Sequence, residues 1–317
     1  MAIDRETLRY LGWWLAFGVL MCLLPFVVGT GTLRILIFAH FLAMFAMSWD
    51  FLSGRTGYIS FGHPFLIGIA GYTTAILSFR FDVPIYYSIP AAIVATMVGG
   101  TLFFLPALRI RGTYFALVTL AFMEILYQLT KVVAPKITGG TRGISGLEAI
   151  VTGAVNNYYL SFGIMFAIGV VLWLLIRTRL GIALSAIRMN EEAVRSTGHN
   201  TTKLKLFAFT VSAAVSGIGG AFYVHYIGSI APRGMFEINF LFTILVAALL
   251  GGAETIIGPI MGAYFLTVLL EYLRPVMPGM ERYLLYGGIA LVLYVVRPEG
   301  IYSIIVDAGR KVQEWRR

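Results

Sequence analysis

Long apolar runs alternate with short polar segments along almost the whole chain. A helix needs about 20 apolar residues to cross the hydrocarbon core of a bilayer. The pattern therefore predicts an all-α polytopic membrane protein with about 10 transmembrane helices in a single domain, residues 1–317. The predicted spans are residues 11–28, 33–53, 59–79, 85–106, 113–130, 158–176, 206–228, 237–251, 255–272 and 283–296.

Glycine and proline interrupt two of these apolar regions. The runs 237–251 and 255–272 are almost continuous, and one long tilted helix is the alternative to two spans. The stretch LSGRTGYISFGHPFLIGIAGYTTA carries a similar mixture of glycines and a proline. Such segments in membrane proteins are often broken helices that line a cavity. We therefore expect some helices to be broken by Gly/Pro.

The distribution of basic residues predicts the orientation of the chain. The sequence is 59% hydrophobic and 12% charged, with a formal net charge of +9. Lysine and arginine accumulate on the cytoplasmic side of membrane proteins, so we attribute this charge to topology and expect no nucleic-acid partner. With ten spans and a cytoplasmic N-terminus, the C-terminus is also cytoplasmic, and 16 of the 24 Lys and Arg lie inside. The other eight lie outside: Arg34, Arg80, Lys131, Lys136, Arg142, Arg233, Arg274 and Arg282.

Residues 177–205 form a charged, helix-forming island between two apolar runs, and the predicted orientation places them in the cytoplasm. The stretch SAIRMNEEAVRST predicts a helix, supported by the i,i+4 pair of Glu191 and Arg195. Gly198 is placed to end this helix, and Asn200 or Thr201 to begin the next. Two interpretations fit: a solvated connector, or a helix that docks a cytoplasmic partner.

Several stretches, in this order, resemble the LivM-type permease subunit of branched-chain amino acid ABC importers. They are LSGRTGYISFGHPFLIGIAGYT, LRIRGTYFALVTLAFMEIL, TGGTRGISGL, TRLGIALSAIRMNEEAVRSTGHN, APRGMF and LLGGAETIIGPIMGAY. The resemblance implies a permease in the inner (plasma) membrane of a prokaryote that forms the translocation path for branched-chain, hydrophobic amino acids. It also implies two ABC ATP-binding subunits, a LivH-type sister permease as heterodimer partner, and an extracytoplasmic solute-binding protein.

In importer permeases, a cytoplasmic loop with an EAA-like motif docks into the ATP-binding subunit as a coupling helix. Glu192, Ala193 and Gly198 match this motif, whereas Val194 replaces its second alanine and the later Leu-Pro is missing. The resemblance thus implies that the loop 177–205 is a coupling loop. The ATPase-docking residues are then Arg188, Glu191, Glu192, Ala193, Val194 and Gly198.

The sequence contains no motif for catalysis or nucleotide binding. It lacks GxxxxGK[ST], the loop that cradles phosphate, so we expect ATP to be bound by partner subunits and no cofactor by this chain. Four scattered histidines offer no metal-ligand spacing, and no catalytic constellation is present, so we predict a non-catalytic subunit. The alternatives are a permease of the same family for urea, amides or aromatic acids and, more remotely, a secondary transporter driven by an ion gradient.

Two further groups of residues are candidates for contact with solute or with the binding protein. The interrupted segment and one acidic residue in a span are candidates for the translocation path, because ionisable groups in spans are often functional. A plain kink, or pairing of Glu124 with a neighbouring helix or subunit, is the alternative. These candidates are Ser60, Phe61, Gly62, His63, Phe65, Tyr72 and Glu124.

Residues 131–157 form the longest predicted extracytoplasmic loop. Its glycine-rich part is the candidate docking surface for the binding protein, while a re-entrant plug or a plain loop is the alternative. The docking candidates are Gly139, Gly140, Thr141 and Arg142.

Overall fold

The structure is a computed structural model that describes residues 5–108, 110, 112–133, 135–277, 281–297 and 300–303. The predictions for both chain ends fall outside these residues. The helices are α1 Arg5–Leu23, α2 Thr30–Trp49, α3 His63–Arg80, α4 Ile85–Ala107, α5 Thr113–Gln128, α6 Pro135–Thr138, α7 Ala154–Ile176, α8 Arg179–Ser196, α9 Thr201–Ile227, α10 Pro232–Met235, α11 Ile238–Gly251, α12 Ile257–Leu273 and α13 Glu281–Val296. The strands are β1 Ile144–Ser145 and β2 Ser229–Ile230. Short 3-10 or π turns occur at Leu24–Phe26, Asp50–Gly54, Leu129–Val133 and Gly140–Arg142.

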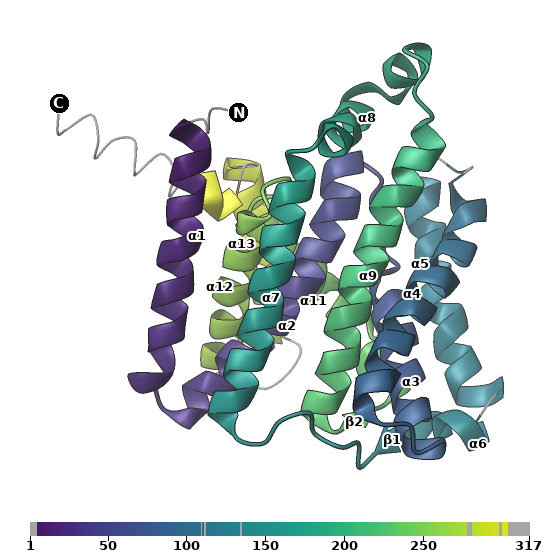
Figure 1. The fold of residues 1–317 in the computed structure, drawn as a ribbon, viewed down its shortest axis with the longest axis vertical. Coiled ribbons are helices and arrows are strands. Elements are labelled where there is room, and N and C mark those ends of the chain that lie inside the picture. The colour runs from purple at the N-terminus through teal and green to yellow at the C-terminus, as the bar shows by residue number, and fades with distance from the viewer. Residues whose placement is uncertain are drawn as a thin grey trace.

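The long helices lie side by side as a bundle (Figure 1), and α8 crosses one end of it. The start of α1 lies at this α8 end, whereas β1, β2 and α6 lie at the opposite end. Among the described residues, six helical segments are long and apolar enough to cross a membrane. They are Thr30–Gly54, Ile85–Ala107, Thr113–Val133, Ala154–Ile176, Thr201–Ile227 and Pro232–Gly251. The chain is therefore a mostly helical, multi-pass membrane protein.

Each of the ten predicted spans overlaps a helix, but ten crossings remain a prediction. Residues 237–251 and 255–272 correspond to α11 and α12, so the alternative of one long tilted helix is wrong. The two helices pack closely because a Cβ at Gly262 would lie 2.0 Å from the carbonyl oxygen of Ala247. Only hydrogen fits at this contact, which explains part of the glycine content of the region.

The predicted span 59–79 begins too early. Residues 58–62 are not helical, and α3 begins only at His63. Pro64 lies in the first turn of α3, where a helix tolerates proline because that N–H needs no helical partner. The proline therefore starts a helix and does not bend one in its interior. The chain breaks between α2 and α3, before the proline.

The core is centred on α2. In the most apolar stretch of the segment that contains α2, 83% of the residues are buried, against 22% in the corresponding stretch of the segment that contains α5. The helix α2 packs against α7, α9, α11 and α12. A polar contact lies inside this core: the Ser48 hydroxyl is 2.8 Å from that of Ser216 and 2.9 Å from that of Ser212. Nε2 of His63 is 3.1 Å from the Ser212 hydroxyl. These pairs join the break before α3 to α2 and α9.

Candidate functional site

The helix α8 consists of two parts. Asn190 has φ −160° and ψ 99°, which is an extended conformation inside the helical range. Its side-chain Oδ1 accepts hydrogen bonds from the backbone N–H groups of Glu192 and Ala193, both at 3.0 Å. This is the geometry of a helix N-cap. The predicted helix 185–197 is therefore interrupted at its centre, and a short second helix carries the EAA-like residues.

Local capping signals set both ends of α8 and the start of α9. The Thr178 hydroxyl accepts from the N–H of Gly181 at 3.4 Å and caps the start of α8. Gly198 has φ +83°, the left-handed conformation that ends a helix at little cost for glycine. The side chain of Asn200 accepts from the N–H of Lys203 at 3.0 Å and caps α9. Asn200, and not Thr201, is thus the cap of the next helix.

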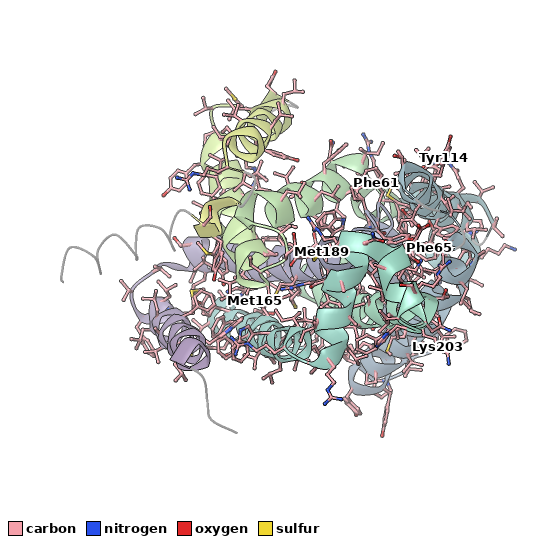
Figure 2. The ribbon with its side chains drawn as sticks, turned by 90° about the horizontal axis from the view of Figure 1, so that it is seen from above. Phe61, Phe65, Tyr114, Met165, Met189 and Lys203 are labelled. Carbon is pink, nitrogen blue, oxygen red and sulfur yellow. The ribbon has the colours of Figure 1, made fainter. Side chains whose placement is uncertain are left out.

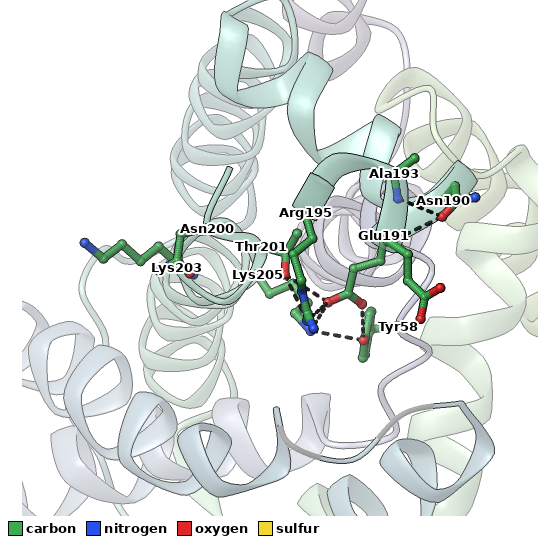
Figure 3. A network of polar contacts seen from close by, with 10 residues as sticks. Tyr58, Asn190, Glu191, Ala193, Arg195, Asn200, Thr201, Lys203 and Lys205 are labelled. Atoms are coloured by element: carbon green, nitrogen blue, oxygen red, sulfur yellow. Dashed lines mark hydrogen bonds and ion pairs between the residues drawn. The ribbon is translucent and has the colours of Figure 1, made fainter. Parts of the chain in front are cut away.

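Glu191 anchors the second part of α8 to the helix bundle (Figure 3). The Tyr58 hydroxyl donates to its Oε2 at 2.6 Å, and Nζ of Lys205 donates to its Oε1 at 3.0 Å. The Thr201 hydroxyl and Nη2 of Arg195 donate to the same Oε1 at 3.0 and 3.2 Å. One carboxylate thus joins α8 to the start of α9 and to the break before α3.

This anchor is shielded from water and remains charged. The side chain of Glu191 is 12% exposed and that of Lys205 is 4% exposed. Burial raises the pKa of Glu191, but hydrogen bonds from Tyr58 and Lys205, together with the lysine charge, outweigh this and lower it to about 2. The Lys205 ammonium also lies 4.4 Å from the centroid of the Tyr58 ring.

Five of the six predicted ATPase-docking residues therefore divide into two groups. Glu192, Ala193 and Gly198 are exposed. Glu191 points into the bundle, and Val194 packs partly buried against the core. Met189 is 88% exposed beside this surface and was missed by sequence reasoning; an unbranched apolar residue just before the EAA-like residues was the available signal. Figure 2, seen from above, places Met189 on α8.

A second attachment joins α8 to the connection between α11 and α12. Nη2 of Arg188 lies 2.8 Å from Oε1 of Glu254, and its Nη1 donates to the carbonyl oxygen of Gly54 at 2.5 Å. Glu254 was not predicted as a site residue. Nothing in the sequence indicates that its loop meets α8.

The predicted path residues do not lie together on one open surface. Ser60, His63, Phe65 and Tyr72 are at most 5% exposed. Gly62 is also buried, and Phe61 is half-buried. The Phe61 N–H donates to the Thr119 hydroxyl at 2.9 Å, which ties the segment to α5. In Figure 2, Phe61, Phe65 and Tyr114 lie on the same side of the molecule. None of the seven candidates lines the pocket between α2, α7 and α9, whose lining includes Phe41, Ser161 and Tyr226.

Glu124 differs from the other six candidates because it is exposed. Among the described residues, its carboxylate accepts a hydrogen bond from the Gln128 amide on the same helix at 2.6 Å. It lies on a stripe along α5 that also presents Tyr114 and Leu117, which are 73% and 54% exposed. Among the residues that the structure describes, this carboxylate forms no salt bridge with a neighbouring helix, which was one of the alternatives for it.

The glycine-rich segment at the opposite end is folded. Strand β1 pairs antiparallel with β2 in the register Ile144–Ile230 and Ser145–Ser229. Gly143 has φ +73°, and a Cβ there would lie 1.9 Å from the carbonyl oxygen of Ile230. Gly140 is buried and Gly139 half-buried, whereas Thr141 and Arg142 are exposed. Of the four binding-protein candidates, Thr141 and Arg142 are thus fully on the surface, whereas Gly140 is internal and Gly139 only partly accessible.

The fold and the site define a class: a multi-pass helical membrane protein with a surface helix held against one end of its bundle. Residues 31–294 match the family described as branched-chain amino acid transport system / permease component. LivM of Escherichia coli (strain K12), the high-affinity branched-chain amino acid transport system permease protein, is 30% identical, with 95% of this chain and 76% of LivM aligned. The chain belongs to this permease family.

Other relatives agree with this assignment. LivM of Salmonella typhimurium (strain LT2) is 29% identical over 95% of this chain and 76% of its own length. The probable LivM of Methanocaldococcus jannaschii is 26% identical over 77% of each chain. No solved structure matches the chain significantly. The chain is thus a permease subunit of an ABC importer, as the sequence predicts, and its family implies ABC transporter partners and a translocation role without catalysis.

Proposed function

We propose that this chain forms half of a passage for branched-chain or related hydrophobic amino acids in the inner membrane of a prokaryote. The observation that carries the proposal is the similarity to LivM over 95% of the chain. In the proposed complex, a LivH-type sister permease forms the other half, two ATP-binding subunits bind the nucleotide, and an extracytoplasmic protein delivers the solute.

Uptake of radiolabelled leucine and ribose by cells that express the complete importer, with or without this chain, tests the substrate. We expect leucine uptake to require the chain and ribose uptake to be independent of it. Leucine uptake that persists without the chain contradicts the proposal. Ribose is the comparison because the ribose import permease RbsC of Haemophilus influenzae is 28% identical over 57% of this chain.

The second part of α8 is the proposed contact with the ATP-binding subunit. The supporting observation is that neighbouring side chains of this helix point in opposite directions. Glu191 points into the bundle, whereas Met189, Glu192 and Ala193 lie on the surface. Changing Glu192→Lys is expected to reduce co-purification of the ATP-binding subunit while membrane insertion is unchanged. Glu237→Lys, at an exposed carboxylate of another loop, is the matched control. Equal recovery of the ATPase with both variants contradicts this assignment.

In the proposed topology the chain crosses the membrane ten times, with both termini in the cytoplasm. The α8 end of the bundle then faces the cytoplasm, and the β1–β2 end faces outward. Cys22 is the only cysteine in the sequence, so a Cys22→Ser chain gives a clean background for thiol labelling. A cysteine at position 192 should react with membrane-impermeant reagent only in inside-out vesicles, and one at position 141 only in right-side-out vesicles. The opposite pattern contradicts the topology.

The exposed stripe on α5 is the proposed wall of the passage. A carboxylate near the centre of a spanning helix costs about 2.5–3.5 kcal/mol when it faces lipid. Glu124 lies in the middle of the segment Thr113–Val133, so water in a passage is a better environment for it than hydrocarbon. The change Glu124→Gln is expected to lower uptake without loss of the ATP-binding subunit. Glu271→Gln, an exposed carboxylate on α12, is the control, and equal uptake by both variants contradicts the assignment.

At the opposite end, Thr141 and Arg142 are the proposed contacts for the solute-binding protein, and Gly139 and Gly140 shape the turn that presents them. The Arg142→Glu change is expected to weaken binding of the solute-binding protein to the detergent-solubilised importer. Lys136→Glu, at another exposed residue of the same segment, is the control. Unchanged binding by the Arg142 variant removes this residue from the interface.

A further inference from the structure

The connection between α11 and α12 has an unfavourable backbone conformation. Glu254 has φ +73° and Ile256 has φ +58°. Positive φ is uncommon outside glycine and is a marked outlier for a β-branched residue such as isoleucine. Such strain persists only where the surroundings hold it, and it concentrates at functional and switch regions.

Groups from the other helix break hold this connection in place. Asp50 is fully buried, and its Oδ1 accepts from the backbone N–H of Glu254 at 2.6 Å. Arg55 donates to the backbone carbonyl of the same residue. Gly54 leaves room for this arrangement, because a Cβ there would lie 2.1 Å from Oδ1 of Asp50. The π turn after α2 and the loop after α11 therefore form one interlocked unit.

The helix α8 is joined to this unit by side chains from two of its turns. Arg188 pairs with the Glu254 carboxylate at 2.8 Å. One turn earlier, the Ser185 hydroxyl accepts from Nη1 of Arg55 at 3.3 Å. The side chains of Arg188 and Glu254 are 41% and 40% exposed. An ion pair this exposed contributes little to folding stability, so the pair can be broken without unfolding the bundle.

We propose that Arg188 and Glu254, supported by Asp50 and Arg55, are positioning residues that carry a movement of α8 to the two breaks between spanning helices, α2–α3 and α11–α12. This inference rests on the proposed docking of α8 to the ATP-binding subunit. When the nucleotide cycle shifts α8, Arg188 moves relative to Glu254. The strained connection between α11 and α12 then switches between two packed arrangements. Two discrete arrangements are expected because tightly packed contacts change in steps and do not deform gradually.

The test is the ratio of solute transported to ATP hydrolysed by the complete importer in proteoliposomes. Arg188→Gln and Glu254→Gln are each expected to lower this ratio about fivefold or more, the usual scale of coupling between distant sites, while the ATP-binding subunit still co-purifies with the Glu254 variant. If the two residues act as a pair, the double variant loses no more than either single variant. The control is the exposed pair of Arg233 and Glu237, and its Gln variants should leave the ratio unchanged.

An unchanged ratio in both single variants, or additive losses in the double variant, overturns the proposal. If Arg188→Gln does not assemble, Glu254→Gln alone decides, because Asp50 and Arg55 contact the backbone of residue 254 and those contacts remain. The result that contradicts docking of α8 is a separate one, namely that Glu192→Lys leaves co-purification of the ATPase intact. Failure of the present inference leaves co-purification and the ratio both unchanged in the Glu254 variant.

Discussion

The buried contact between Glu191 and Lys205 gives the sharpest prediction for stability. Replacing Glu191 by Gln keeps the size of the side chain but leaves the Lys205 ammonium, only 4% exposed, without its carboxylate. A pKa difference of one corresponds to about 1.4 kcal/mol. Lowering the pKa of Glu191 from 4.5 to about 2 therefore corresponds to about 3 kcal/mol. Breaking a buried ion pair by removing one partner typically costs about 3–5 kcal/mol, so the two estimates agree.

The assay is equilibrium unfolding in mixed micelles with increasing SDS, followed by tryptophan fluorescence. We expect Glu191→Gln to lower the free energy of unfolding by about 3 kcal/mol. The control is Glu237→Gln, which removes an exposed i,i+4 pair with Arg233 and should cost less than about 1 kcal/mol. If the Glu191 variant costs no more than this control, the contact is not the anchor that its geometry indicates.

Three further outcomes follow from the structure. The free energy of unfolding lost in Glu191→Gln should be constant from pH 8 to pH 5 and should shrink as the pH falls below about 4.5 toward 2. The reason is that a carboxylate whose pKa is lowered by folding stabilises the folded state fully only above its unfolded pKa. SDS unfolding at several pH values measures this loss, and a loss that grows in acid contradicts the prediction. Gly143→Ala should destabilise the chain more than Gly153→Ala. Both glycines have positive φ, but a Cβ at Gly143 would lie 1.9 Å from a backbone oxygen, whereas a Cβ at Gly153 would have no atom within 4 Å. Equal thermal stability of the two purified variants refutes this. Asn190→Ala should cost about 1 kcal/mol through loss of the N-cap, measured by SDS unfolding, and no loss contradicts the cap.

Local signals in the sequence predicted the helices and many of their ends. Gly198 and Asn200 act through their own backbone and nearest neighbours, so their roles as helix stop and helix cap can be read from the sequence. The long apolar runs predicted the spanning helices because they too are a local property of the sequence. The break at Asn190 was also local, but the stretch 185–197 has the pattern of one continuous helix, and the i,i+4 pair of Glu191 and Arg195, which lies wholly after the break, gave no sign of it.

Contacts between distant segments could not be predicted. Asp50 lies near the end of a predicted span, and nothing local shows that its carboxylate is buried against a backbone N–H 204 positions later. Glu191 looked like an exposed docking residue because helix periodicity does not reveal that Tyr58 and Lys205 lie beneath it. His63 and Ser60 were assigned to a path from composition, whereas packing against α9 and α2 buries them.

The helix α9 is held at both of its ends. Near its start, Lys205 is clasped to α8 through Glu191. Near its finish, Nδ1 of His225 lies 2.8 Å from the carbonyl oxygen of Glu148, and the β2 strand that follows pairs with β1. Its 27 residues correspond to a rod of about 40 Å at 1.5 Å per residue. A tilt of α9 imposed at one membrane surface would thus reach the other surface through this single rigid helix, without any intermediate chain of side-chain contacts.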